Sequence, residues 1–186
     1  MTQDLFSLKD KIALITGSGR GIGYTLAKGL GQAGATVILN DIDSDRLNKS
    51  IENLIEKGVT AHHSLFDVRN ESDIDTEVRS IEKDIGPIDI LINNAGIQIR
   101  GPLENFNLKD WQNLMDINLT GAFLTTKAVV TGMIERKAGK IINICSIQSE
   151  LARPTIAPYT AAKGGLKMLT RGMATRLPRA AATSCT

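Results

Sequence analysis

The sequence has 186 residues, enough for one domain with a substantial apolar core. Hydrophobic residues make up 42% and charged residues 23%, and the net charge is only +2. No basic block indicates binding to nucleic acid or to an anionic membrane, no apolar run is long enough to span a bilayer, and the amino terminus has no apolar signal core. We therefore expect a cytoplasmic protein with neither a nucleic-acid nor a membrane partner.

Short apolar segments alternate along the chain with segments of helical character. The expected strands cover residues 11–16, 36–40, 59–68, 88–92 and 140–145. The expected helices cover residues 21–33, 43–57, 70–85 and 108–136, and another helix begins near Tyr159. Apolar strands joined by helical crossovers predict a parallel sheet covered on both faces. We expect an α/β fold with a doubly wound, Rossmann-type parallel sheet in a three-layer α/β/α arrangement.

The first strand-to-helix turn is rich in glycine and reads Thr-Gly-Ser-Gly-Arg-Gly-Ile-Gly over residues 16–23. Glycines permit positive φ and let the backbone approach a ligand closely. The following helix N-terminus offers amide donors and a positive dipole end to a pyrophosphate. Because it lies between a strand and a helix, the motif predicts a dinucleotide site. Its candidate cofactor-binding residues are Gly17, Ser18, Arg20, Gly21, Ile22 and Gly23.

Asp41 follows the second strand, about twenty residues after the glycines, where a carboxylate can accept hydrogen bonds from an adenosine ribose. The alternative is a turn residue, although Asp43 or Ser44 could cap the next helix instead. Arg20 would welcome a 2′-phosphate, whereas Asp41 would repel one. The sequence therefore leaves the choice between NAD and NADP open.

Polar residues also follow the third and fourth strands. Asp67 and Val68 would lie near an adenine, and Asn94, Ala95 and Gly96 would reach the same carboxyl edge, where parallel sheets bind ligands. The alternative for the latter group is a plain Asn/Gly turn. Within the long helix, Asn118 either caps a local backbone distortion or holds a water. His62 and His63 are adjacent in a strand and would face opposite sides, so we expect no metal site.

The fifth strand ends at Ser146, and Tyr159 and Lys163 follow in the first turns of the next helix. A spacing of four places these two side chains on one helix face. A free tyrosine has a pKa of about 10, and a nearby ammonium favours the phenolate, so the phenol could exchange protons with a substrate. Ser146 could hydrogen-bond the same substrate oxygen. The alternative for Tyr159 and Lys163 is an amphipathic surface pair.

Together these motifs, in this order over about residues 8–175, resemble the short-chain dehydrogenases/reductases. The resemblance implies an NADP or NAD cofactor, with Tyr159 as general acid/base, Ser146 holding the substrate oxygen and Lys163 binding the ribose. It makes Asn118 the holder of a water in a proton relay, and implies assembly as a homotetramer or homodimer. An alternative activity within the family is reduction of 3-ketoacyl or other carbonyl substrates.

Within this family, residues 93–100, 135–146 and 147–151 are most similar to the gluconate 5-dehydrogenases. That similarity implies interconversion of gluconate and 5-ketogluconate. Arg100 could reach over the site and bind a sugar-acid carboxylate through paired hydrogen bonds. Gln148, just after Ser146, could bind sugar hydroxyls. The alternative for each is a solvated loop residue.

The sequence departs from the family pattern after Thr175. The pattern would continue with a sixth strand, a Pro-Gly turn, a substrate lid and a seventh strand. We therefore divide the chain into a dinucleotide-binding domain, residues 1–175, and an aberrant tail, residues 176–186. We expect a sheet that lacks its last strands, with residues 140–145 as an exposed edge, low stability and little turnover. The alternative function is a dinucleotide-binding remnant without activity.

Overall fold

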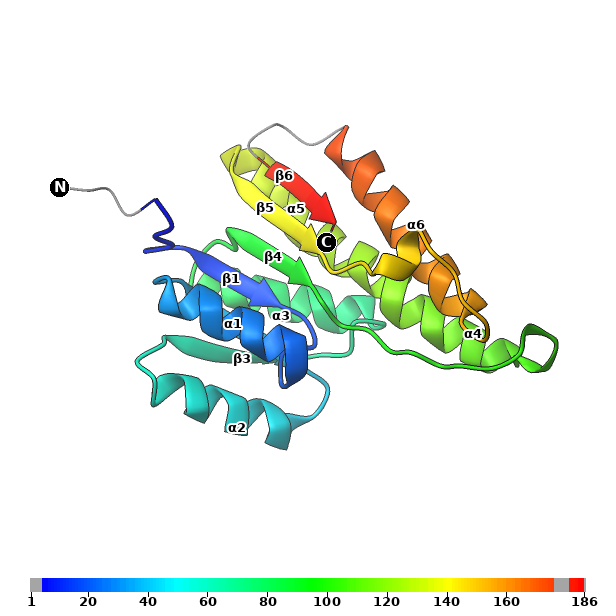
Figure 1. Cartoon of the computed structure of the whole chain (residues 1–186). Coiled ribbons are helices and arrows are strands. Elements are labelled where there is room, and N and C mark those ends of the chain that lie inside the picture. Colours follow the sequence, from blue (N-terminus) through cyan, green and yellow to red (C-terminus); the bar gives the residue numbers. More distant parts are fainter. Residues whose placement is uncertain (1–4, 176–180, 186) are drawn as a thin grey trace.

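Six parallel strands form one sheet within residues 5–175 and 181–185, the parts of the chain that this computed structural model describes. The strand order is β3-β2-β1-β4-β5-β6, so the order reverses between β1 and β4 (Figure 1). The strands are β1 Ile12–Ile15, β2 Thr36–Asp41, β3 Ala61–Leu65, β4 Ile90–Asn93, β5 Gly139–Asn143 and β6 Ala181–Cys185. This order is that of a doubly wound dinucleotide-binding sheet, and it confirms the predicted fold class.

The helices begin and end close to the predicted residues. They are α1 Gly21–Gln32, α2 Ser44–Ile55, α3 Glu71–Asp84, α4 Leu108–Met115, α5 Gly121–Arg136 and α6 Ala157–Ala174. Side-chain caps explain several starts: Asp43 accepts a hydrogen bond from the Arg46 amide, and Asn70 accepts from the amides of Ser72 and Asp73. The sequence did not indicate the short 3₁₀ turns η1 Leu103–Asn105 and η3 Ile147–Ser149. It offered a backbone distortion at Asn118 as one of two alternatives, and the π-helical turn η2 Asp116–Thr120 lies there, between α4 and α5.

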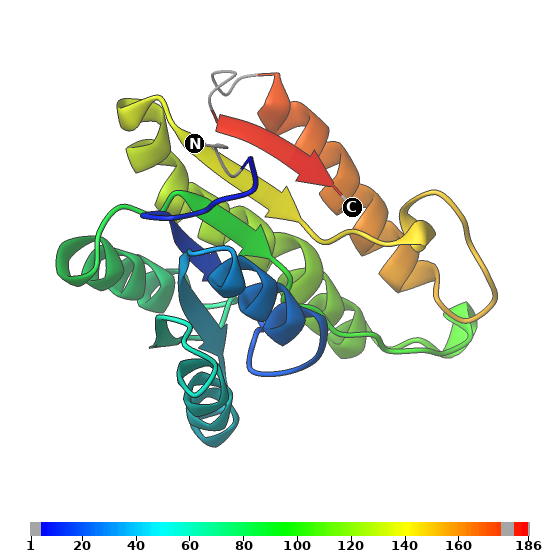
Figure 2. The same cartoon turned by 60° about the vertical axis from the view of Figure 1, so that its left-hand side comes forward.

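The two faces of the sheet bury alternate residues of each strand. Ala13 and Ile15 of β1 pack in a cluster with Leu47 and Leu54 of α2. Leu14 points to the other face, into a cluster that includes residues of α3 and α5, and it is fully buried. Helices therefore cover both faces, as Figure 2 shows from a second direction.

The fifth strand is not an exposed edge, so this expectation was wrong. β6 pairs in parallel with β5, with Gly139 opposite Ala181 and Asn143 opposite Cys185. The Ala-Ala-Thr-Ser-Cys sequence of β6 has few of the branched and aromatic residues that indicate a strand. Residues 176–180 and 186 of the expected tail lie outside the described residues. The described sheet still has one strand fewer than the seven that the family resemblance implies.

One helical region, Leu108–Arg136, has the length and apolarity to cross a membrane by composition alone. The expectation that no run is long enough was therefore too strong. Core helices of soluble proteins pass the same test, and here Val129 and Met133 of α5 are fully buried against the sheet with Leu91. Packing against the sheet thus explains this buried part of α5, whereas Phe123 and Ile134 of the same helix are exposed.

Candidate active site

A cleft of about 380 Å³ lies at the carboxyl ends of the strands, next to the point where the strand order reverses. Most of the predicted cofactor-binding residues line it: Gly17, Arg20, Gly21, Ile22, Asp41, Asp67, Val68, Asn94, Ala95 and Gly96. The sequence analysis missed further lining residues, namely Asn40, Ile42, Arg46, Phe66, Arg69, Ile97 and Ile117. Several of these residues are sequence neighbours of predicted ones, such as Asn40 and Ile42 beside Asp41. Their position at the end of a strand could therefore have identified them as cleft residues.

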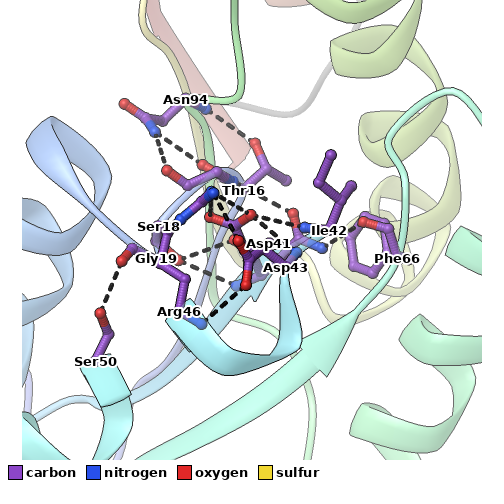
Figure 3. Close-up of polar contacts among 12 residues, drawn as sticks. Thr16, Ser18, Gly19, Asp41, Ile42, Asp43, Arg46, Ser50, Phe66 and Asn94 are labelled. Carbon is purple, nitrogen blue, oxygen red and sulfur yellow. Dashed lines mark hydrogen bonds and ion pairs between the residues drawn. The ribbon is translucent and has the colours of Figure 1, made fainter. Parts of the chain in front are cut away.

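The glycine loop and the turn after β4 pack backbone to backbone. Gly17 has a φ of +61°, and a Cβ there would lie 2.8 Å from the Cα of Ala95. The Asn94 Nδ2 donates to the carbonyl oxygens of Thr16 and Gly17, each at 2.9 Å (Figure 3). Only a residue without a side chain fits at Gly17, and Asn94 fixes the loop from the other side.

Two predicted cofactor residues support the loop from inside and do not line the cleft. Ser18 is fully buried, and its hydroxyl donates to the Ile15 carbonyl at 2.7 Å and accepts from the Asn40 amide at 3.0 Å. A Cβ on Gly23 would lie 2.5 Å from the Asn94 Nδ2. Both residues therefore shape the turn that a ligand would contact.

The carboxylate of Asp41 is turned toward the protein, although the residue lines the cleft. Asp41 is 6% exposed, and its Oδ1 accepts from the amides of Ile42 at 2.8 Å and Asp43 at 3.2 Å. The Arg46 guanidinium donates to both of its oxygens, at 3.0 and 3.2 Å. The alternative of a turn residue therefore describes its contacts in the structure.

A second acidic residue of the cleft is also held by an arginine. Arg69 Nε lies 3.0 Å from each carboxylate oxygen of Asp67, and Arg69 also donates to the Asn113 side chain. The hydrogen bonds from Arg69 lower the pKa of Asp67, so this side chain stays ionised. Beside it, Val68 packs against Gly121, where an added Cβ would lie 2.8 Å from the Val68 Cγ2.

Lys163 is buried close to Tyr159 on the first turns of α6. Its Nζ lies 5.9 Å from the centroid of the Tyr159 ring and donates to the Ile144 carbonyl at 2.7 Å. Lys163 is 4% exposed, and this burial lowers its pKa from 10.5 to about 8. An amphipathic surface pair would leave the lysine in solvent, so that alternative does not describe this site.

The Ser146 hydroxyl is oriented by its own turn. Ser146 caps η3, with its Oγ accepting a hydrogen bond from the Gln148 amide at 3.2 Å, while its own amide donates to the Ser149 Oγ. Because one acceptor position of the oxygen is occupied, the hydroxyl hydrogen remains suited to donate to a substrate oxygen.

Asn118 lies in the π-helical turn, so the predicted backbone distortion is present. Its Nδ2 donates to the carbonyls of Ile97 at 3.0 Å and Leu114 at 2.9 Å, while its buried Oδ1 has no partner among the described residues. A Cβ on Gly96 would lie 2.7 Å from this Oδ1 and 3.7 Å from the Lys163 Nζ. The Asn118 Oδ1 and the Lys163 Nζ therefore both lie beside Gly96, where a bound molecule could form hydrogen bonds with both.

Comparison with known proteins identifies the family of this chain. The family described as short chain dehydrogenase matches residues 11–182. The chain belongs to the short-chain dehydrogenase family.

Curated relatives in this family include enzymes of sugar-acid metabolism. The chain is 53% identical over 176 residues to 5-keto-D-gluconate 5-reductase of Escherichia coli (strain K12), covering 95% of this chain and 69% of that protein. It is 54% identical over 172 residues to gluconate 5-dehydrogenase of Gluconobacter oxydans (strain 621H), covering 92% and 67%. The chain thus spans about two thirds of the length of these relatives.

A solved structure of the same family superimposes closely. It is a gluconate 5-dehydrogenase from Burkholderia cenocepacia J2315 in complex with NADP and tartrate. The TM-score is 0.92 with 48% identity, and the match covers 97% of this chain and 72% of that one. The resemblance seen in the sequence is confirmed by both kinds of comparison.

The cleft of this short-chain dehydrogenase fits a nicotinamide dinucleotide. Gly21, at the start of α1, lines the cleft and has no atom within 4 Å of where a Cβ would lie, so there is room for a ligand beside this helix N-terminus. Within the described residues no group of three or more histidine, cysteine, aspartate or glutamate residues could hold a metal.

The two predicted substrate residues lie on neighbouring loops. Arg100 is exposed and donates to the Gln98 side chain at 3.2 Å. The adjacent Gly101 amide donates to the Thr155 carbonyl, which links this loop to the segment between Ser146 and Tyr159. Gln148 is partly buried, and its Oε1 has no partner among the described residues.

Proposed function

We propose that this chain is an NAD(P)-dependent oxidoreductase that interconverts a hydroxyl group of a sugar acid and its ketone, with gluconate and 5-ketogluconate as the pair. The observation that carries the proposal is the convergence of Asn118 and Lys163 beside Gly96, at the end of a cleft formed by a dinucleotide-type glycine loop. The identities of 53% and 54% to enzymes of this sugar-acid pair support the substrate.

The roles of the residues follow from their contacts. Gly17, Gly21 and the amides that begin α1 would hold the pyrophosphate, because that wall is open and carries helix amides. Ser146 would donate its hydroxyl hydrogen to the substrate oxygen, and Tyr159 would remove or return the proton of the reacting hydroxyl. When bound, the nicotinamide ring supplies hydride chemistry at the adjacent carbon.

Lys163 would act through its ammonium, which lies near the Tyr159 ring and, like the buried Asn118 Oδ1, beside Gly96. Its ammonium holds a positive charge near Tyr159, which favours the ionised phenol during proton transfer. The buried Asn118 Oδ1 has no hydrogen-bond donor among the described residues. A water molecule that donates to this oxygen would link Asn118 to Lys163. The chain would thus orient the substrate and move one proton.

The test is the rate of 5-ketogluconate reduction by the purified chain, followed as loss of NADPH or NADH absorbance. Tyr159→Phe should lower turnover by at least about 100-fold, the usual contribution of a general acid/base, while cofactor binding measured by calorimetry is retained. Tyr24→Phe, in α1, is the matched control and should leave turnover unchanged. Near-normal turnover in Tyr159→Phe would refute the role of this phenol.

Two further measurements separate the alternatives. Arg100→Ala should raise the Michaelis constant for gluconate much more than that for the cofactor, whereas Arg79→Ala on α3 should change neither. An acetoacetyl thioester turned over faster than 5-ketogluconate would favour a ketoacyl reductase. Cofactor binding by the unmodified chain without any turnover would favour a dinucleotide-binding protein without activity.

A further inference from the structure

We propose that Asn40 is a positioning residue that holds the pyrophosphate end and the adenine end of the cofactor cleft at a fixed separation. Its buried carboxamide joins the glycine loop, which would hold the pyrophosphate, to the segment after β3, which would lie beside the adenine. The inference rests on the proposed dinucleotide function, and it adds a residue that would affect cofactor binding without touching the cofactor.

The side chain of Asn40 is fully engaged inside the protein. The residue is 1% exposed, although it borders the cleft. Its Oδ1 accepts a hydrogen bond from the Gly17 amide at 3.3 Å, and its Nδ2 donates to the carbonyl oxygens of Ser64 at 3.1 Å and Phe66 at 2.9 Å. Because both amide hydrogens have partners, Asn40 would act through the segments that it joins rather than on a ligand.

The two segments that this carboxamide joins form different parts of the cleft wall. Gly17 lines the cleft on the side of the glycine loop, and residues 66–68 line it after β3. Figure 3 shows the glycine loop and Phe66 around the end of β2. The pairing of β2 with β3 ends at Asp41 and Leu65, so beyond that pair the Asn40 side chain connects the adenine wall to β2.

The backbone of Asn40 holds the glycine loop separately from the carboxamide. Its amide donates to the Ser18 hydroxyl at 3.0 Å, and its carbonyl accepts from the Ser18 amide at 2.7 Å. Replacement of Asn40 by alanine would keep these bonds and remove only the link between Gly17 and Phe66. A ligand that spans two subsites binds more tightly than its separate pieces only where the subsites are held at a matching separation. The carboxamide would supply that match.

The test compares ADP, which spans both ends, with adenosine and inorganic pyrophosphate, which each occupy one end. Dissociation constants are measured on the purified chain, for ADP by calorimetry and for the two pieces by ligand-observed NMR titration. The product of the two constants for the pieces, divided by the constant for ADP, gives an effective concentration. Asn40→Ala should lower this effective concentration by at least about tenfold, while each piece binds within about threefold of its original affinity.

Two further variants separate positioning from folding. Asn40→Asp keeps the size of the side chain and the acceptor for Gly17 but removes both donors, so it should also lower the effective concentration. Its added charge acts on ADP and on pyrophosphate alike and cancels in the quotient. Ser64→Ala, opposite Asn40 in the strand register, removes a buried hydrogen bond to Glu77. This control should lower the urea midpoint without changing the effective concentration.

The outcomes separate this inference from the proposed function. An unchanged effective concentration in either Asn40 variant with a native circular dichroism spectrum would overturn the role of Asn40 alone, as would an equal fall in Ser64→Ala. Failure of the unmodified chain to bind ADP, NAD and NADP would overturn the dinucleotide function, and the inference with it. A lowered effective concentration in a chain that never turns over 5-ketogluconate would support the role of Asn40 and count against the proposed activity.

Discussion

Replacing Lys163 with methionine should stabilise the chain near neutral pH. The folded state buries this amine and lowers its pKa from 10.5 to about 8, so below pH 8 the folded chain carries a buried charge. This pKa difference corresponds to about 3 kcal/mol by which the buried charge destabilises the folded state. Methionine removes that cost, but it also loses the hydrogen bond to the Ile144 carbonyl, which contributes about 1 kcal/mol. We expect a net gain of about 2 kcal/mol in the free energy of unfolding at pH 7.

The sign of the pH dependence is specific to a lowered pKa. Between pH 8 and 10.5 the unfolded state binds more protons at Lys163 than the folded state, so the unmodified chain gains stability as pH rises. The advantage of Lys163→Met should therefore disappear near pH 10. Urea unfolding followed by circular dichroism at pH 7 and pH 10 measures both values.

The matched control is Lys127→Met, because the ion pair with Glu71 raises the pKa of Lys127. This variant should lose stability at pH 7 rather than gain it, and the loss should shrink at high pH. The reasoning about Lys163 would be refuted by a methionine variant that is less stable at pH 7, or by a difference that does not change with pH.

Two further predictions concern packing and buried hydrogen bonds. Gly121→Ala would press a Cβ against Val68 and should destabilise the fold by about 1–3 kcal/mol, whereas Gly29→Ala, in open space on α1, should stabilise it by about 0.5–1 kcal/mol. Equal melting shifts in this pair would contradict the packing argument. Thr126→Val removes the hydroxyl that accepts from the buried Asn93 Nδ2 and should cost about 1–3 kcal/mol in urea unfolding. An unchanged midpoint would show that the bond contributes nothing.

The positions of the site could be predicted because they depend on local signals. A glycine-rich turn between a strand and a helix, and polar residues at strand ends, come together whenever parallel strands share one carboxyl edge. Gly17, Asp67 and Gly96 line the cleft for that reason. Topology determines these contacts, so the sequence pattern was sufficient.

Side-chain pairing could not be predicted in the same way. Asp41 was expected to face a ribose, but its orientation depends on Arg46, which lies on the next helix and offers no pattern of its own. Ser18 was predicted to bind the cofactor, and the sequence did not indicate that the Ile15 carbonyl and the Asn40 amide hold its hydroxyl inside the loop. β6 was missed because its Ala-Ala-Thr-Ser-Cys sequence has few of the branched and aromatic residues that indicate a strand, whereas its pairing with β5 is a property of the backbone.

The π-helical turn at Asp116–Thr120 has a consequence for the long helical region as a whole. Such a turn adds one residue to the helix, so the phase of every later side chain is offset by about 100° from an uninterrupted α-helix. Deleting one residue there would straighten the hydrogen-bonding ladder, yet it would rotate Val129 and Met133 off the sheet. The π-helical turn thus allows one continuous helical region to place the Asn118 amide beside the cleft and the apolar side chains of Val129 and Met133 against the sheet.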